Sequence, residues 1–525
     1  MPRAPSGPSS TVRWVLIGLV TFQFLAVAIG IRQNLPYAPE VDEPIFVGRA
    51  VHIASSGDLN PGWFGNPGST VIYPLAAMYH LWYAGTHQGM LWRPDPNLQA
   101  SFDASFAEYY LLGRLLTLAY AVMCVLLIYH VGALISGPKA GLLGAGLSVL
   151  SSLTLYHSQV VRTDIAGEFF GLLSLYLCLR LLTHYSLAAY LLAGGVIGLG
   201  ISTRYFLAAM LPVLLLVGLL VIYKRQRSLR LSKAVCLELG SGLLVAPLAF
   251  AASSPFFFLS FQTALHDLAV EARSNHLGAD GLPPLGNLWW YATSALPQDA
   301  GWPQLALSVI GVVLAIRRRA LASLLLIVYG GAFLGGTVLS PLHWARWLIP
   351  ILPLFSLLAA YALVEAVVPS LKRLSREPRL KAAMPLLAVL LVSVWPAYQL
   401  ARFDISKLGP STRIQAREWL VRNLPGGSKI AQESYGALLA GTSFAVAEEG
   451  ALPAAHTLAE YREAGYQYLI ASSYMYERYL AEPSRYVREA TFYHDLFSRG
   501  RLIQQFEGSL TSSGPTIRVY DIRAP

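Results

Sequence analysis

The chain has 525 residues, of which 55% are hydrophobic and only 13% are charged. A soluble domain carries about 25% charged residues, so this composition excludes an ordinary soluble protein and indicates long apolar segments in a membrane. The formal net charge of +10 is compatible with an acidic partner such as nucleic acid, but the positions of the charges decide between that reading and a membrane surface.

Hydropathy and helix breakers predict about eleven membrane-spanning helices. In chain order their expected ranges are 13–32, 108–135, 140–158, 165–183, 188–202, 205–223, 234–253, 302–316, 320–340, 345–368 and 382–400. We expect the first to remain in the protein, because it is long enough to span and lacks the small-residue cleavage site of a signal peptide. The expected fold class is a polytopic α-helical membrane protein.

Basic residues in the short loops predict the orientation. With the N-terminus in the cytoplasm, the basic loops 137–139, 224–233, 317–319 and 372–381 all fall on the cytoplasmic side. Lys and Arg collect in cytoplasmic loops, so the agreement supports both the orientation and the number of spans. The net charge is thereby assigned to the lipid surface, and no nucleic-acid partner is expected. The expected location is a plasma membrane, such as the inner membrane of a bacterium.

Three long segments are expected outside the cytoplasm: 33–107, 254–300 with a helical stretch at 261–275, and the region after 402. Residues 1–400 are predicted to form one transmembrane module. Residues 401–525 read as a small soluble α/β domain, because a helix at 413–423 precedes short strands that alternate with helical segments. The expected strands lie at 429–432, 468–472, 504–508 and 517–522.

The first chemical feature is the acidic pair Asp42-Glu43, just after the first span. Transfer of a sugar to a hydroxyl or amine needs a general base, and a carboxylate held at the membrane surface suits that task. The structural alternative is a solvated loop pair, or an N-cap for the helix expected from Ile45 to Ser55.

A second group, His157, Arg162 and Asp164, lies between the third and fourth expected spans. Charged residues near a membrane core are costly and often functional, although these three could also lie at the interface. Arg162 and Asp164 are spaced so that they could orient each other.

Three cations end different spans at one predicted membrane level: Arg204, His343 and Arg346. Arg binds phosphate well through its planar guanidinium, which suits a donor of the polyprenyl-phosphate type. The structural alternative is snorkelling to lipid headgroups. Arg204 fits that alternative least, because it joins two apolar segments without a real loop. The three cysteines have no metal-site spacing, and no phosphate-binding loop is recognisable.

The order of several short motifs along the chain resembles a known class. These motifs are Asp42-Glu43, Asn60-Pro61, Trp63-Phe64, Arg162-Thr163-Asp164, Thr203-Arg204-Tyr205 with Pro212, Arg346 to Pro350, Glu418-Trp419 and Tyr520-Asp521-Ile522. Together they resemble the GT-C glycosyltransferases related to protein O-mannosyltransferases and to bacterial lipid A aminoarabinose transferases. The resemblance covers nearly the whole chain.

The resemblance implies an inverting transfer of one sugar from a polyprenyl-phosphate carrier at the outer face. It implies Asp42 as the base, and it implies basic residues on later helices that bind the donor phosphate, which Arg204 and Arg346 match. Our hypothesis adds Glu43 and Asp164 as catalytic residues that orient the base and the substrate. Arg162, Arg204, His343 and Arg346 are the expected substrate-binding residues. The chain departs from the family in having Arg204 where Lys is frequent and Trp347 where Tyr is frequent, so the identity of the donor sugar stays open.

The acceptor stays open among glycan, lipid and protein. No cofactor is expected; a divalent metal is possible, but no acidic residues have ligand spacing that demands one. Two other functions are compatible with the sequence. A flippase of lipid-linked sugars predicts paired repeats and charges at the midplane, and neither is evident. A non-catalytic membrane scaffold that binds glycan through its outer domain is harder to separate from an enzyme.

Overall fold

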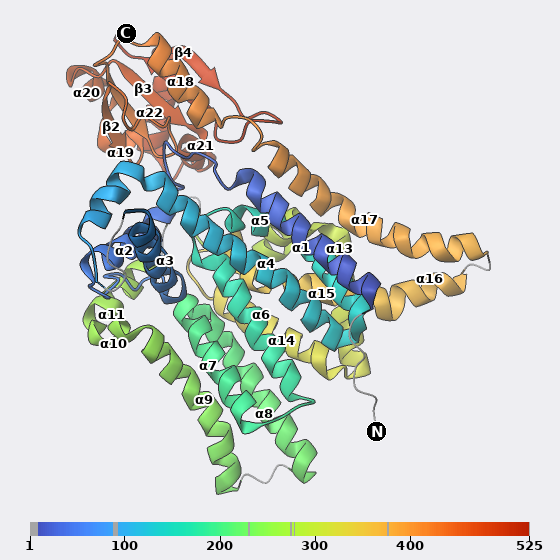
Figure 1. The fold of residues 1–525 in the computed structure, drawn as a ribbon. Coiled ribbons are helices and arrows are strands. Elements are labelled where there is room, and N and C mark those ends of the chain that lie inside the picture. The colour runs from blue at the N-terminus through green and yellow to red at the C-terminus, as the bar shows by residue number, and fades with distance from the viewer. Residues whose placement is uncertain are drawn as a thin grey trace. The chain divides into compact units, whose positions relative to one another are not determined.

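The computed structural model describes residues 9–87, 93–228, 232–273, 276–277, 279–374 and 377–523 (Figure 1). It divides into two compact units. The helical unit comprises residues Met1–Ile31 and Val41–Leu400, and the α/β unit comprises Arg32–Glu40 and Ala401–Pro525. The two units are described separately.

The helical unit consists of helices, several of them interrupted by a short 3-10 or π-helical turn. In chain order they are α1 (Ser10–Gly30), α2 (Glu43–Ser56), α3 (Ser69–His87), α4 (Asn97–Ser148), α5 (Ser152–Ser158), α6 (Thr163–Leu181), α7 (Leu187–Thr203), η1 (Tyr205–Met210), α8 (Leu211–Gln226), α9 (Lys233–Ser253), α10 (Pro255–Leu259), α11 (Phe261–Glu271), α12 (Pro284–Trp290), η2 (Tyr291–Ala295), α13 (Leu296–Arg318), α14 (Leu321–Val338), η3 (Ala345–Ile351), α15 (Leu352–Ala362), η4 (Leu363–Val367), α16 (Val368–Leu374) and α17 (Pro378–Ile405). Of the expected helical stretch 261–275, α11 covers the first part, and residues 274 and 275 lie outside the described residues.

Within the described ranges, eight helical segments are long and apolar enough to cross a membrane, and α7 is a shorter apolar helix. Kinks divide some of these segments. Helix α4 loses helical geometry at Ser136 and Gly137, where φ of Gly137 is 82°, and α13 does so at Gly301, where φ is 75°. Only glycine adopts this left-handed region without steric cost, so each glycine ends one helix and Pro138 or Pro303 follows in the next. The expected polytopic helical class is confirmed, and the number of spans stays a prediction.

Helix α6 lies at the centre of the helical unit, where it packs against α4, α7 and η3. Helix α7 also packs closely on α9, as Figure 1 shows. This close approach depends on two glycines: a Cβ at Gly194 would stand 2.2 Å from the carbonyl oxygen of Gly242, and one at Gly198 would stand 2.2 Å from that of Ala246. The glycine-rich sequence of α7 therefore fixes the position of its C-terminal end.

The α/β unit contains one five-stranded sheet. Its strands are β1 (Lys429–Glu433), β2 (Ala445–Glu449), β3 (Tyr468–Ser472), β4 (Arg501–Phe506) and β5 (Ile517–Asp521), and its helices are α18 (Thr412–Asn423), α19 (Leu452–Ala455), α20 (Leu458–Glu463), α21 (Ser473–Ala481) and α22 (Val487–Arg499). The strand order is β2-β1-β3-β5-β4. Strand β1 pairs in parallel with β2 and β3, whereas β5 pairs antiparallel with β3 and β4.

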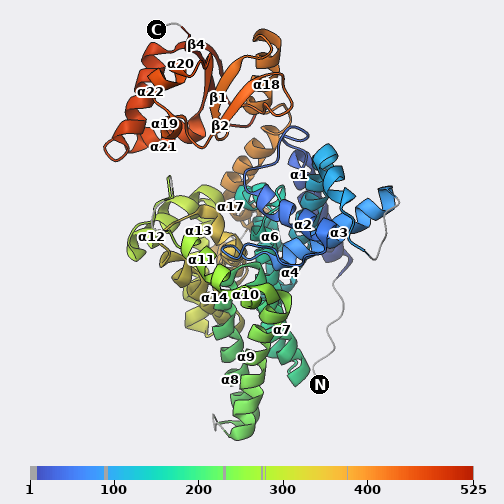
Figure 2. The same cartoon turned by 90° about the vertical axis from the view of Figure 1, so that its left-hand side faces the viewer.

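Side chains of the central strands alternate between two cores. Tyr468 and Ile470 of β3 pack on the face that α18 covers, whereas Leu469 and Ala471 pack on the face of α20 to α22. Figure 2 shows α18 and α22 on opposite sides of the sheet. The expected α/β fold is confirmed. The sequence indicated β1, β3, β4 and β5, with β4 starting at Arg501 rather than residue 504, but it did not indicate β2.

Candidate active site

Six charged or titratable side chains of the helical unit form a connected ion-pair network around the start of α6. Its members are Asp42, His157, Arg162, Asp164, Arg204 and Arg346. They come from four separate parts of the chain, between residues 42 and 346. The structure thus brings together five of the seven predicted site residues, together with His157, which the sequence groups with Arg162 and Asp164.

Asp42 directly precedes α2, but its side chain makes no capping hydrogen bond. Its carboxylate instead accepts a hydrogen bond from Arg162, and Arg346 Nη1 lies 3.9 Å from the same oxygen. The Asp42 side chain is 34% exposed, whereas that of Asp164 is 2% exposed. Of the two network carboxylates, only Asp42 can therefore reach a substrate that arrives from solvent.

Asp164 lies in the first turn of α6 and holds the network together. One carboxylate oxygen pairs with Arg204, and the other accepts from Arg162 Nε at 3.1 Å. His157 Nδ1, which has no hydrogen-bond partner among the described residues, stands 3.7 Å from Asp164 Oδ2. A carboxylate with an arginine on each oxygen is a weak proton acceptor, so we expect Asp164 to fix the arginines and not to act as the base.

Arg162 lies between α5 and α6 and is held by both network carboxylates. Burial opposes its charge, but Asp164 and Asp42 outweigh burial and raise the pKa of the guanidinium further above its ordinary value. Arg162 is therefore charged at every physiological pH.

Arg204 and Arg346 occupy breaks between helices. Arg204 has extended backbone between α7 and η1, and its aliphatic chain crosses Gly167 so closely that a Cβ there would stand 2.9 Å from Arg204 Cδ. Arg346 lies in η3 with its guanidinium 4.3 Å from the ring centroid of Trp344, and its side chain is 24% exposed. Three guanidinium groups thus face two carboxylates, which leaves one uncompensated positive charge on the network. An anionic group would bind there.

Glu43 points away from this network. Its two carboxylate oxygens accept from Nε and Nη2 of Arg114, at 2.8 and 2.7 Å, and both side chains are completely buried. Glu43 Oε1 also accepts from the backbone N–H of Val161 at 2.9 Å, next to Arg162. The sequence interpretation missed Arg114. Its only signal was a single cation inside the apolar run of the second span.

His343 also lies outside the network. Its ring stacks on Trp290, with the ring centroids 4.1 Å apart, and its Nδ1 is 3.0 Å from Asn287 Oδ1. Arg346 is therefore part of the network, whereas His343, three residues earlier in the chain, packs against α12. In the part of the chain that the structure describes, no group of three or more His, Cys, Asp or Glu side chains is placed to hold a metal ion.

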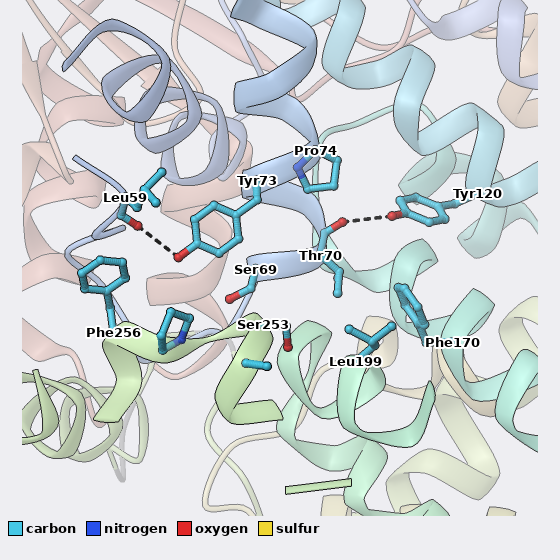
Figure 3. A pocket seen from close by; sticks show the side chains of 12 residues that line it. Leu59, Ser69, Thr70, Tyr73, Pro74, Tyr120, Phe170, Leu199, Ser253 and Phe256 are labelled. Atoms are coloured by element: carbon cyan, nitrogen blue, oxygen red, sulfur yellow. Dashed lines mark hydrogen bonds between the residues drawn. The ribbon is translucent and has the colours of Figure 1, made fainter. Parts of the chain in front are cut away.

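An apolar cavity of about 470 Å³ lies among several helices of the helical unit (Figure 3). Its walls include Tyr73, Tyr120, Phe170, Leu199 and Phe256, which come from α3, α4, α6, α7 and α10. Thr70, which also lines the cavity, hydrogen-bonds the Thr203 hydroxyl at 2.6 Å. Thr203 directly precedes Arg204 in the chain, so a residue of the cavity wall is hydrogen-bonded to the neighbour of a network arginine.

Comparisons with known proteins bear on the fold. A family model described as dolichyl-phosphate-mannose-protein mannosyltransferase matches residues 107–250, a segment that includes Arg162, Asp164 and Arg204. No curated protein gives a significant sequence match.

Three solved structures share the fold. ArnT from Cupriavidus metallidurans bound to undecaprenyl phosphate has a TM-score of 0.51 at 13% identity, over 98% of this chain and 100% of that chain. The same protein in the apo state has a TM-score of 0.52 at 14% identity and the same coverage. The Archaeoglobus fulgidus oligosaccharyltransferase tethered with an acceptor peptide has a TM-score of 0.50 at 12% identity, over 96% of this chain and 74% of that chain. The chain is an integral membrane protein with a GT-C glycosyltransferase fold, related to that of the mannosyltransferases and of ArnT.

Proposed function

We propose that the protein is a glycosyltransferase that moves a single sugar from a polyprenyl-phosphate carrier to an acceptor on the outer face of the membrane. The observation that carries the proposal is the ion-pair network, in which one accessible carboxylate, Asp42, stands beside an excess of guanidinium groups. A base for the acceptor and a binding site for the donor phosphate are thereby adjacent.

The donor would bind through its phosphate and its apolar chain. Arg346 holds its carboxylate most loosely, at 3.9 Å, so an incoming phosphate can draw it away from Asp42. Arg204 is fixed by Asp164 and supplies a second guanidinium at a set position. The apolar cavity, with a wall residue hydrogen-bonded to Thr203, has the chemistry to hold part of the isoprenoid chain.

The transfer itself would be a single displacement. Asp42 accepts the proton of the acceptor hydroxyl, and the hydroxyl oxygen forms a bond to the anomeric carbon on the face opposite the phosphate. The bond from that carbon to the phosphate oxygen breaks, and its electron pair leaves with the polyprenyl phosphate. Attack from the opposite face inverts the anomeric configuration. Arg204 and Arg346 stabilise the negative charge that collects on the leaving phosphate.

Glu43 and Asp164 act by position in this scheme. Asp164 sets the spacing of Arg162 and Arg204. Glu43 fixes the backbone at Val161 and, through Arg114, the start of α2 next to Asp42. His343 lies outside the ion-pair network, against Trp290 and Asn287, and would only form part of the protein surface around the substrate.

Replacing Asp42 tests the proposal. The full-length protein, purified in lipid nanodiscs, is given polyprenyl-phosphate sugars that carry labelled mannose, glucose, arabinose or aminoarabinose, and release of the sugar is measured. We expect Asp42→Asn to lower the rate by at least about 100-fold, the usual contribution of a general base, with normal protein yield. Asp103→Asn is the matched control, because Asp103 is an exposed acid of the same outer segment, 33–107, and lies outside the network. Turnover by Asp42→Asn at the rate of the unchanged protein would overturn the assignment.

A further inference from the structure

A surface of the α/β unit has no part in the scheme above. It comprises two tyrosines, Tyr435 and Tyr474, with three charged side chains around them, Glu40, Arg413 and Arg478. We call these five residues the tyrosine surface. Its rings lie at the carboxyl ends of neighbouring parallel strands, since Tyr435 follows β1 and Tyr474 follows β3. In sheets of parallel strands, ligands bind in the loops at this end.

The two rings are held in a fixed arrangement. Their centroids are 5.5 Å apart with an interplanar angle of 76°, and the Arg478 guanidinium carbon lies 5.6 Å from the centroid of Tyr435. Tyr474 is 47% exposed, although it is a large ring with an apolar face. An exposed aromatic that other side chains hold in place presents contact area at little further cost in entropy.

The backbone at Tyr435 is strained. Its φ is 65°, in the left-handed region that a bulky side chain rarely adopts, although Gly436 follows directly. Arg413 Nε donates to the carbonyl oxygen of Gly436 at 2.8 Å and holds the turn in place. Strain that the surrounding structure maintains is typical of functional sites, because a relaxed turn would direct the side chain elsewhere.

Charged side chains lie near Tyr474. Partial burial is the largest cause that raises the pKa of Tyr474. The nearby Glu40 carboxylate raises this pKa further, whereas Arg413 lowers it. Aromatic faces with a carboxylate and guanidinium groups beside them suit a sugar. The C–H groups of a pyranose ring lie on the negative face of an aromatic ring, and its hydroxyls hydrogen-bond to charged groups at the edge.

We propose that the tyrosine surface is a carbohydrate-binding site of the α/β unit that holds one sugar ring of a glycan. The two tyrosines supply the aromatic faces, and Arg478, Arg413 and Glu40 supply charged groups at their edges. This binding goes beyond the proposed transfer and does not depend on it.

A peptide fits this surface less well than a sugar does. Strands β1 and β3 are interior in the order β2-β1-β3-β5-β4, so neither has a free edge to which a peptide could add as a further strand. The surface offers rings and charges at strand ends, not a row of backbone donors and acceptors.

Glycan binding by the intact protein tests the inference. The full-length protein in nanodiscs is applied, with no donor present, to an array of glycans ending in hexoses, pentoses, N-acetylhexosamines and aminosugars. We expect a subset to bind, and we expect Tyr474→Ala to weaken that binding at least about 10-fold, since one stacked ring contributes roughly 1–3 kcal/mol. Tyr474→Phe keeps the ring face and should stay within about threefold. Leu502→Ala is the control, because Leu502 is equally exposed, at 47%, on β4 of the same unit.

The possible outcomes separate this inference from the proposed function. Absence of any bound glycan, or equal binding by Tyr474→Ala and the unchanged protein, would overturn the inference. Tyr474-dependent binding of tyrosine-containing or acidic peptides without glycan binding would overturn it as well. Because the array holds no donor, binding does not depend on transfer. Glycan binding together with full activity of Asp42→Asn would leave the tyrosine surface standing and refute the assignment of Asp42.

Discussion

At the scale of single residues, the pair Glu43–Arg114 separates positioning from chemistry at this site. Both side chains are buried, at 0% and 1% exposure, and two parallel hydrogen bonds join them. Removing one partner of a buried pair leaves the other charge uncompensated, which costs about 3–5 kcal/mol. We therefore expect Glu43→Gln to lower the thermal unfolding temperature of the purified protein and to lower activity in proportion to the loss of folded protein.

A double-mutant cycle provides the control. Glu43→Gln combined with Arg114→Gln should be less destabilised than the sum of the two single variants, because no uncompensated charge remains. A Glu43→Gln protein that unfolds at the normal temperature but no longer transfers sugar would instead assign Glu43 a role in the reaction. In that case Glu43 would take a direct part in the transfer, and its bond to Arg114 would be secondary.

The residues of the site were predictable to different degrees. The basic loops set the orientation, and with it the topology predicts Asp42, Asp164, Arg204 and Arg346 on one side of the membrane; the ion pairs among them appear only in the fold. The topology does not predict the direction in which a side chain points. Glu43 is adjacent to Asp42 in sequence but pairs with Arg114, 71 residues away, and no local pattern encodes that contact.

At the scale of elements, the packing of α7 on α9 sets where Arg204 stands. Gly198 lies six residues before Arg204, and a Cβ there would meet the carbonyl oxygen of Ala246 at 2.2 Å and Ala249 Cβ at 2.7 Å. The carbonyl oxygen belongs to the α9 backbone and Ala249 Cβ is attached directly to it, so neither can move aside and Gly198→Ala must displace one helix. We expect this variant to raise KM for the polyprenyl-phosphate donor several-fold, because Arg204 shifts away from its partners.

Gly195→Ala is the matched control in the same helix. A Cβ at Gly195 meets only Val245 Cγ1, at an ordinary contact distance of 3.7 Å. Alanine favours helix over glycine by about 1 kcal/mol, so this variant should be as stable as the unchanged protein or slightly more stable, with KM unaltered. Equal KM values for the two variants would show that the end of α7 does not position the donor site.

Elements were easier to predict than their details. The long apolar helices followed from hydropathy, and the break in α4 followed from Gly137-Pro138. Strand β2 escaped prediction because it is an edge strand, partly exposed along its length, so it lacks the apolar alternation that identified β1 and β3. The glycines of α7 marked an unusual helix in the sequence, but their partners on α9 appear only in the fold.

At the scale of the whole molecule, orientation in the membrane decides whether the proposed chemistry is possible. Asp42 and Asp164 are separated from the basic loops 137–139 and 317–319 by predicted spans, so all network residues are expected on the side opposite those loops. A donor carried by a polyprenyl phosphate and an acceptor on the outer face both require this arrangement.

Thiol labelling in intact cells tests the orientation. Cys124 and Cys178 are buried, so Cys236→Ser removes the exposed native thiol. In that background we expect a membrane-impermeant maleimide to modify Asp103→Cys and Glu418→Cys in intact cells, because both positions are exposed and predicted to lie outside. Lys139→Cys, exposed in the basic loop 137–139, should react only after permeabilisation. The reverse pattern would place the ion-pair network in the cytoplasm, where an outer-face acceptor could not reach Asp42, and the proposed reaction would be impossible.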